Sequence, residues 1–480
     1  LQEGIASAAA IDAVAMKAFR IGMGPFALMN LTGPPIALHS TDYLAEQLET
    51  PRYVGAENLR EMVEAGDQWE IGEDTDCSDE AARIIRTRLL GQVFAVAGQI
   101  VDEEVCSLED VDRGAKVGLR WARGPFELAN RLGIDSAKAM AEDYCELANF
   151  PVPEIWKREG DFSFSYVDLD ISDGIATVTI NRPEAMNALN ETVVNQLGDA
   201  LDKANSDNSV RTIVLDGAGK AFVAGADVKF FVDKIRADSF PDIYEFTANG
   251  HVVQNKLESS SKTTIALTTG LALGGGLELA LSCDYRIGTR KTQFRFPETS
   301  IGIFPGLGGT QRPARIAGLP AARWAVLAGN FMDARTAADL GMVTNLVDVT
   351  KVDETISMLD AQGKPAEKYP AKPMNADSKI AKFAQNFYSD ENLETILNGN
   401  CPDGFDPEDK LVSRQMKSLS RTAPIALRMA SDLIDAAGAT ELSDGLSQEL
   451  GKLEAIFSTD DALEGLSALI EGRKPSYQNS

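Results

Sequence analysis

Residues 271–281 read Leu-Ala-Leu-Gly-Gly-Gly-Leu-Glu-Leu-Ala-Leu, an apolar run that contains one carboxylate, Glu278. The three glycines allow the backbone to approach a ligand closely. A helix that begins at these glycines would direct its unpaired N–H groups and its positive dipole end toward a developing negative charge. A second carboxylate, Glu298, follows a strand-like segment at 292–296 and precedes another glycine-rich run at 305–309. Two carboxylates beside such an anion hole indicate acid–base chemistry on a carbonyl compound.

The composition limits the classes of protein that need to be considered. A chain of 480 residues is long enough for two or three domains, and its 44% hydrophobic and 25% charged residues are typical of a globular protein. The net charge of −26 argues against a nucleic-acid partner, because phosphate binding needs clustered Lys and Arg. No apolar stretch of about 20 residues predicts a membrane span. Five scattered cysteines and two distant histidines predict neither a disulfide framework nor a metal site, and they favour the cytoplasm.

An internal repeat occupies the first third of the chain. Residues 3–33 align without gaps onto residues 103–133. In both copies a Ser precedes apolar positions at helical spacing, which predicts a capped helix, and a Gly-Pro-Phe triplet then ends that helix and begins another. Residues 1–155 are therefore predicted to form two related all-helical units. An amphipathic segment, 79–100, precedes only the second copy, so we expect the chain to be part of a longer polypeptide.

The sequence changes character after residue 151. Two prolines and a charged run within 151–160 interrupt the helical pattern. Expected strands such as 174–180 then alternate with expected helices such as 190–204, which is typical of an α/β core with crossover helices. The predicted domains are two helical repeats (1–75 and 76–155), a linker (156–164), the α/β core (165–347), an irregular insertion (348–420) and a helical C-terminal part (421–480).

Four segments of the α/β part carry a specific resemblance. They are Asn-Arg-Pro-Glu-Ala-Met-Asn-Ala-Leu at 181–189, Ala-Phe-Val-Ala-Gly-Ala-Asp-Val-Lys at 221–229, and the glycine-rich segments 270–284 and 296–312. In this order and at these spacings they closely resemble the crotonase superfamily and, within it, enoyl-CoA hydratase. The resemblance implies a multidomain protein: an all-α tandem repeat followed by an α/β domain with the ClpP/crotonase-like spiral and a helical C-terminus.

The resemblance also implies roles for individual residues. Backbone N–H groups of Ala226 and Gly275 would form the oxyanion hole that holds the thioester oxygen. Glu278 and Glu298 would grip one water molecule, and the sequence leaves open which of them is the acid. Lys229 would offer its positive charge to a phosphate of CoA. The implied CoA-binding residues are Ala224, Ala226, Asp227, Val228 and Lys229.

Both glutamates also allow simpler roles, and related activities share their motifs. Taken alone, Glu278 could complement the dipole of its own helix, and Glu298 could be a surface turn residue after Pro297. The stretch 388–396 resembles an insertion of the 3-hydroxyisobutyryl-CoA hydrolases. That family, however, lacks a glutamate at the position of Glu278 and has an aspartate where this chain has Gly306. Enoyl-CoA isomerases commonly keep only one of the two carboxylates.

The helical half resembles the C-terminal domain of 3-hydroxyacyl-CoA dehydrogenases, present here as a tandem repeat. The Gly-Pro-Phe-Glu-Leu-Ala-Asn form at 124–130 is the better match. In those enzymes the NAD-binding domain and a catalytic His/Glu pair lie upstream, and this chain has no comparable Gly-x-Gly-x-x-Gly. The resemblance thus implies that NAD would be a cofactor only if an upstream domain is present. For residues 1–155 it implies a role in packing and dimerisation.

The sequence therefore predicts the C-terminal portion of a bifunctional dehydrogenase/hydratase that retains the hydratase. The expected reaction is the reversible hydration of a short trans-2-enoyl-CoA, such as crotonyl-CoA, to the 3-hydroxyacyl-CoA, without a metal or redox cofactor. The expected partners are the acyl-CoA substrate and further copies of the chain, in a dimer- or trimer-based homo-oligomer, but neither nucleic acid nor membrane. The alternative is a non-catalytic docking or dimerisation fragment.

Overall fold

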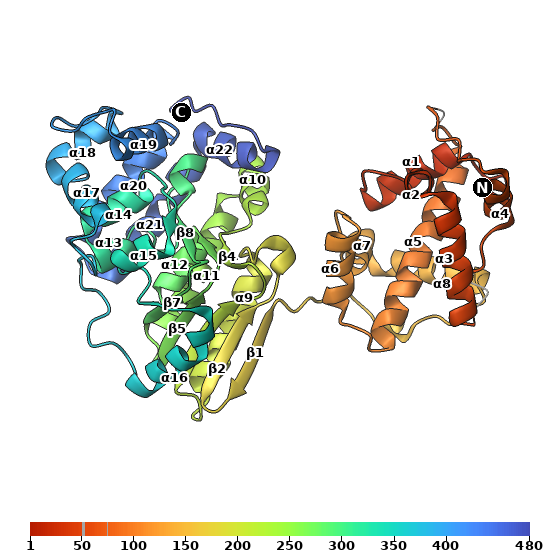
Figure 1. The fold of residues 1–480 in the computed structure, drawn as a ribbon, viewed down its shortest axis with the longest axis horizontal. Coiled ribbons are helices and arrows are strands. Elements are labelled where there is room, and N and C mark those ends of the chain that lie inside the picture. The colour runs from red at the N-terminus through yellow and green to blue at the C-terminus, as the bar shows by residue number, and fades with distance from the viewer. Residues whose placement is uncertain (50–52, 74) are drawn as a thin grey trace. The chain divides into compact units, whose positions relative to one another are not determined.

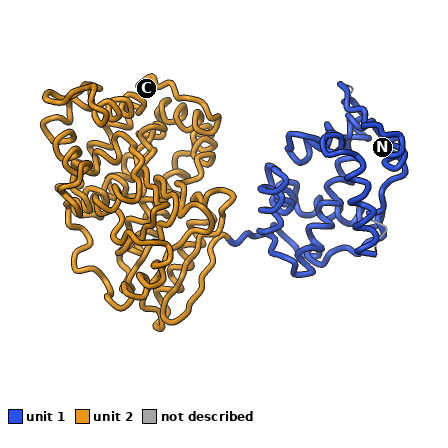
Figure 2. Tube along the Cα trace, in the orientation of Figure 1, with its two compact units in different colours: residues 1–165 blue, residues 166–480 orange. Residues whose placement is uncertain are grey.

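A computed structural model describes residues 1–49, 53–73 and 75–480. The chain divides into two compact units, residues 1–165 and residues 166–480, which Figure 2 shows in different colours. Each unit has its own secondary structure and its own buried core, so each is described by itself.

Unit 1 is helical (Figure 1). Its longest helix, α5, begins at Asp79, where the side chain of Ser78 caps the first turn. The described helices are α1 (Ala8–Phe19), α2 (Pro25–Thr32), α3 (Pro34–Gln47), α4 (Glu57–Ala65), α5 (Asp79–Asp102), α6 (Leu108–Gly118), α7 (Pro125–Leu132) and α8 (Ile134–Leu147).

The internal repeat is preserved in the hydrogen bonds of unit 1. In each copy a buried aspartate accepts two backbone N–H groups from the first turn of the next helix, all at 2.8 Å: Phe26 and Ala27 donate to Asp12, and Phe126 and Glu127 donate to Asp112. These bonds satisfy N–H groups that a helix start leaves unpaired. The predicted Ser caps and the predicted helix starts at Gly-Pro-Phe are confirmed.

Limited space at the helix start accounts for the glycine of the Gly-Pro-Phe triplet. A Cβ on Gly124 would lie 2.2 Å from the Cγ of Asp112, whereas a Cβ on Gly114, within α6, would meet no atom within 4 Å. Gly124→Ala is therefore expected to destabilise the protein by about 1–3 kcal/mol through overpacking. Gly114→Ala is the matched control and should stabilise α6 by about 0.5–1 kcal/mol. Urea unfolding monitored by circular dichroism measures both, and equal effects would contradict a steric requirement at Gly124.

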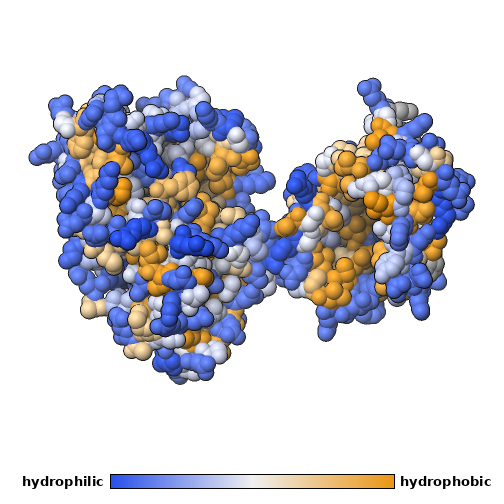
Figure 3. Space-filling model, in the orientation of Figure 1, coloured by the Kyte–Doolittle hydropathy of each residue, from blue (hydrophilic) through white to orange (hydrophobic). Residues whose placement is uncertain are grey.

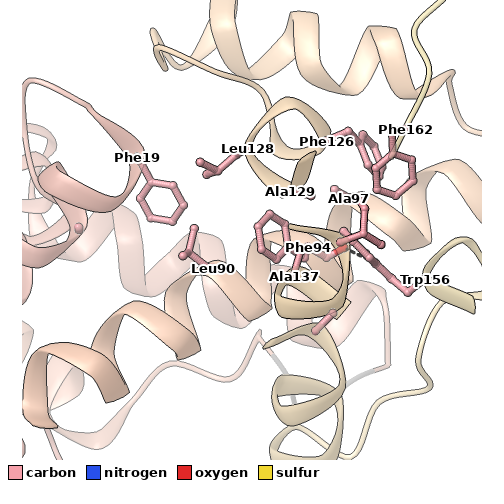
Figure 4. Packing of buried hydrophobic residues seen from close by; sticks show 13 residues of the cluster. Phe19, Leu90, Phe94, Ala97, Phe126, Leu128, Ala129, Ala137, Trp156 and Phe162 are labelled. Atoms are coloured by element: carbon pink, nitrogen blue, oxygen red, sulfur yellow. Dashed lines mark hydrogen bonds between the residues drawn. The ribbon is translucent and has the colours of Figure 1, made fainter. Parts of the chain in front are cut away.

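The predicted linker at 156–164 is wrong. Trp156 is fully buried and Phe162 is 3% exposed, and both pack in the core of unit 1 with Phe94 and Phe126 (Figure 4). The side chain of Asn130 exchanges two hydrogen bonds with the backbone of Phe162. In the first repeat Asn30 makes the same pair of bonds with Trp69. The segment is thus the last part of the second repeat, and its aromatic side chains, not its charges or the prolines before it, decide its structure.

In the described part of the chain, α5 is the one helix long and apolar enough, by length and composition alone, to cross a membrane. Within unit 1, its side chains Leu90 and Phe94 are fully buried in the helical core, as Figure 4 shows.

Unit 2 contains two β-sheets. One has the strand order β1-β2-β3-β5-β7-β10 and the other has the order β4-β6-β8-β9. The neighbouring strands β2, β3, β5 and β7 are parallel and are joined through helices, as the alternating pattern predicted. The strands are β1 (Val167–Ser172), β2 (Ile175–Ile180), β3 (Thr212–Gly217), β4 (Ala221–Ala224), β5 (Thr263–Thr268), β6 (Leu271–Leu273), β7 (Tyr285–Gly288), β8 (Gln293–Arg295), β9 (Met332–Asp333) and β10 (Asn345–Leu346).

The helices of unit 2 cover both sheets and continue to the C-terminus (Figure 1). They are α9 (Glu191–Ser206), α10 (Val228–Arg236), α11 (Phe240–Glu258), α12 (Gly275–Leu281), α13 (Arg312–Ala317), α14 (Leu319–Val326), α15 (Ala334–Asp339), α16 (Val352–Gln362), α17 (Lys379–Phe387), α18 (Asp390–Leu397), α19 (Lys410–Leu419), α20 (Pro424–Ala437), α21 (Leu442–Phe457) and α22 (Asp460–Glu471).

The prediction of an irregular insertion at 348–420 is wrong. The segment contains the helices α16 to α19, separated by the Pro- and Gly-rich turns that suggested irregularity. Phe387 and Tyr388 are fully buried, and the hydroxyl of Tyr388 donates a hydrogen bond of 2.9 Å to Gln415. Each helix is only 8 to 11 residues long, so the Pro and Gly turn signals between the helices dominate the sequence pattern.

Candidate active site

The small sheet places three chain segments at one edge. Strands β4, β6 and β8 are parallel, and their register aligns Ala224 with Leu273 and Leu273 with Arg295. Because these strands end together, the residues that follow them emerge side by side. The predicted site residues Ala226, Gly275 and Glu298 each follow one of these strand ends.

Glycine is required at the turn from β6 into α12. Gly274 has φ 46° and ψ −123°, a backbone conformation that residues with a Cβ rarely adopt. A Cβ at this position would also lie 2.2 Å from the Oε1 of Glu298. The turn thus brings the start of α12 close to the second carboxylate. The first N–H groups of α12 have no carbonyl partner within the helix.

Glu278 lies in α12 and is 1% exposed. Its Oε1 accepts hydrogen bonds of 2.7 Å from the backbone N–H groups of Leu307 and Gly309. Burial raises the pKa of the Glu278 carboxyl to about 7, although the two amides favour its ionised form. The group is thus balanced between its two protonation states near neutral pH.

Glu298 begins the short 3₁₀ helix η4 (Glu298–Ile301) and is 7% exposed. Its Oε2 is buried and has no hydrogen-bond partner among the described residues. Burial, and then the negative charge of Glu278, raise the pKa of the Glu298 carboxyl well above its usual range. Glu298 thus holds its proton more tightly than an ordinary carboxyl group does.

Both carboxylates line one cavity of about 230 Å³, together with Ala226 and Gly275. The amide nitrogen of Ala226 lies 3.9 Å from the position that a Cβ on Gly275 would take. Hydrogen bonds between Leu189 and its partners Gly225 and Asp227 fix the loop that carries Ala226. The four residues predicted for the carboxylates and the oxyanion hole therefore lie around one space.

The predicted CoA-binding residues are divided by the structure. Ala224, Ala226 and Val228 line the cavity. Asp227 instead caps α10 by accepting the backbone N–H of Lys229. The side chain of Lys229 is 70% exposed, and its ammonium forms an ion pair of 2.8 Å with Asp233. Neither Asp227 nor Lys229 is among the lining residues of this cavity.

Comparison with known proteins follows the division into two units. The sequence model of the family described as enoyl-CoA hydratase/isomerase matches residues 175–480, which is more than half of the chain. The chain belongs to the enoyl-CoA hydratase/isomerase family. The model of the 3-hydroxyacyl-CoA dehydrogenase C-terminal domain matches residues 1–71 and again residues 85–158. The expected tandem repeat in front of a crotonase domain is confirmed.

Individual proteins match about two thirds of this chain over nearly their whole length. A probable enoyl-CoA hydratase of Mycobacterium bovis is 30% identical and covers 63% of this chain and 94% of its own length. A crotonyl-CoA hydratase of Syntrophomonas wolfei is 28% identical over 66% of this chain and 98% of its own length. The crystal structure of an enoyl-CoA hydratase from Rhodobacter sphaeroides has a TM-score of 0.56 at 23% identity, covers 65% of this chain and 92% of that one, and shows the shared fold.

The family motifs do not include the apolar walls of the cavity, and sequence reasoning missed them. Phe231 and Phe246 come from α10 and α11, and their rings lie 5.7 Å apart. Phe457 of α21 stacks on Phe231 at 5.1 Å, and Leu466 and Leu469 of α22 complete the wall. Hydrophobic residues gather on the surface near α10 and α22 in Figure 3. Leu469 of α22 is 52% exposed. In the sequence these residues are marked only by their helical spacing. That spacing does not distinguish residues that line a cavity from residues of a hydrophobic core.

Proposed function

We propose that this chain catalyses the reversible hydration of a trans-2-enoyl-CoA to the 3-hydroxyacyl-CoA. The observation that carries the proposal is the pair of buried carboxyl groups, Glu278 and Glu298, which line one cavity but have different hydrogen-bond environments. Addition of water needs both a base and an acid, and two carboxyls whose environments separate their pKa values can supply both.

The hydrogen bonds support a division of the two roles. The two amides that donate to Glu278 stabilise its ionised form, so Glu278 is the base. Glu298 has no such donors at its Oε2 and faces the charge of Glu278, so Glu298 retains the proton and is the acid. The sequence alone left this division of roles open.

The reaction then follows from these positions. Glu278 removes a proton from water as the water oxygen bonds to the β-carbon, and Glu298 gives its proton to the α-carbon. Negative charge develops on the thioester oxygen, and the N–H groups of Ala226 and Gly275 stabilise it. One such preorganised donor contributes about 3–4 kcal/mol in other enzymes that form an oxyanion. Both carboxyls recover their starting protonation by exchange with solvent.

The size and lining of the cavity support a substrate with a short acyl chain. Its volume of about 230 Å³ and its walls of Phe and Leu side chains suit a small apolar group. CoA thioesters are the substrates of enoyl-CoA hydratases, and the hydration steps need no redox or metal chemistry. We infer a cytoplasmic homo-oligomer for this chain.

The test is an absorbance assay for the loss of the enoyl thioester of crotonyl-CoA on the purified chain. The turnover number should rise as pH rises through about 7, where Glu278 loses its proton. It should fall again at higher pH, where Glu298 loses the proton that it must donate. A non-catalytic docking fragment predicts no loss of absorbance at any pH, and isomerisation would move the double bond without adding water.

A further inference from the structure

A third buried carboxylate lies on the opposite side of the glycine loop that holds Glu278. Leu307 and Gly309 donate their backbone N–H groups to Glu278, both at 2.7 Å. The backbone N–H groups of Gly308 and Thr310 instead donate hydrogen bonds to the carboxylate of Glu449, at 2.7 Å and 3.1 Å. Successive amides of 307–310 thus alternate between two carboxylates.

Glu449 belongs to α21, in the C-terminal helical part, and is fully buried. The hydroxyl of Thr310 donates a further, short hydrogen bond to it. Two backbone carbonyl groups at the start of this loop also have side-chain partners. His251 Nε2 lies 2.7 Å from the oxygen of Gly306, and Arg312 donates to the oxygen of Leu307 at 3.1 Å. The loop therefore has its amides fixed from two sides and has little freedom to move.

We propose that Glu449 is a positioning residue for the base Glu278: it fixes the loop 307–310 so that two amides point at Glu278. This inference rests on the proposed function. Glu449 touches neither the cavity nor the reacting atoms, so its effect passes through the loop. A displacement of about 1 Å in a catalytic group can cost about 100-fold in rate.

The charges around Glu449 come from three helices and the loop. Glu278 of α12 and Arg312 of α13 act on it, and His251 of α11 lies 3.7 Å from its Oε2. Burial lowers the pKa of His251 to about 4, so this histidine is neutral at physiological pH. Burial and the charge of Glu278 raise the pKa of Glu449 to about 8. With this raised pKa Glu449 is mostly protonated near neutral pH, so its effect on Glu278 passes through the loop.

The test is Glu449→Gln in the full chain. Its amide has nearly the same size but cannot accept hydrogen bonds through both terminal atoms, so one loop amide loses its acceptor. We expect the turnover number for crotonyl-CoA to fall about 10- to 100-fold with the KM changed less than about 3-fold. The amides of Leu307 and Gly309 lower the pKa of Glu278, so their displacement should raise it. The fall in turnover toward acid pH, the acid limb of the pH profile, should therefore move to higher pH.

Asp284→Asn is the matched control. Asp284 is also a buried carboxylate of unit 2, accepts the N–H of Thr264 at 3.0 Å, and lies outside the cavity. It should alter stability without moving the acid limb. If Glu449→Gln does not fold, Thr310→Val removes only the hydroxyl donor and should lower the turnover number in the same direction. A folded Glu449→Gln or Thr310→Val with the wild-type turnover number and acid limb overturns the inference.

A second readout does not need activity. Glutamate labelled with ¹³C at the carboxyl carbon reports the titration of Glu278 by NMR, with the signal assigned through its loss in Glu278→Gln. Glu449→Gln should shift that titration to higher pH because the loop amides stabilise the ionised form of Glu278, and no shift overturns the inference. An inactive wild-type chain would overturn the proposed hydration, and the NMR titration would still decide whether Glu449 acts on Glu278.

Discussion

Glu278→Gln is expected to lower the turnover number for hydration of crotonyl-CoA by about 10²–10⁴-fold, the usual contribution of a general base. Glutamine keeps an oxygen that can accept both loop amides, from Leu307 and Gly309, so the local structure should remain. Its amide cannot remove a proton from water. Because the walls of the cavity and the oxyanion amides are unchanged, the affinity for a CoA thioester should change little. Steady-state kinetics and equilibrium binding of a non-reactive CoA thioester measure the two effects.

The pH dependence of the residual activity of Glu278→Gln gives a second test. The group whose pKa is raised to about 7 is gone, so the fall in rate toward acid pH should disappear. Glu454→Gln, on the exposed face of α21, is the matched control and should keep both the rate and the pH profile. Wild-type turnover in Glu278→Gln would contradict the assignment of the base.

Glu298→Gln is expected to lower the turnover number by a similar factor, about 10²–10⁴-fold, because the α-carbon loses its proton donor. The Oε2 of Glu298 has no hydrogen-bond partner among the described residues, so replacing that oxygen by an NH₂ group breaks no bond of the folded protein. Exchange of the α-hydrogen of the 3-hydroxyacyl-CoA with deuterium from solvent should fall with the same factor.

The pH profile separates the two variants. Glu298→Gln should lose the fall in rate at alkaline pH and keep the acid limb, which is the reverse of Glu278→Gln. Retained α-hydrogen exchange in Glu298→Gln would show that another group protonates the α-carbon. Identical profiles for the two variants would contradict the division into base and acid.

Much of unit 2 could be predicted because its signals are local. The expected strand 174–180 is found as β2 and the expected helix 190–204 as α9, since an alternating or helical hydrophobic pattern is written within a few consecutive residues. The glycines before Glu278 likewise predicted a helix start, because a backbone with φ 46° at Gly274 is a property of one position. Unit 1 was predicted for a similar reason: two copies of one pattern support each other.

Two segments were misread from their local composition. The prolines at 151 and 153 and the charged run after them suggested a linker at 156–164, but two buried aromatic side chains, Trp156 and Phe162, attach that segment to the helical core. In 348–420 the Pro and Gly signals between the short helices suggested irregular structure. In both cases packing against distant parts of the chain overrode local composition.

The sequence by itself determined the element types, the repeat and the pair of glutamates, since these depend on neighbouring residues. The tertiary structure alone decided which amides hold which carboxylate. Gly308 and Glu449 are 141 residues apart, and no local pattern relates them. The acid and base roles depend on burial and on those hydrogen bonds, because the pKa of a carboxyl group is set by the solvent it has lost and by the donors it has gained in the folded state.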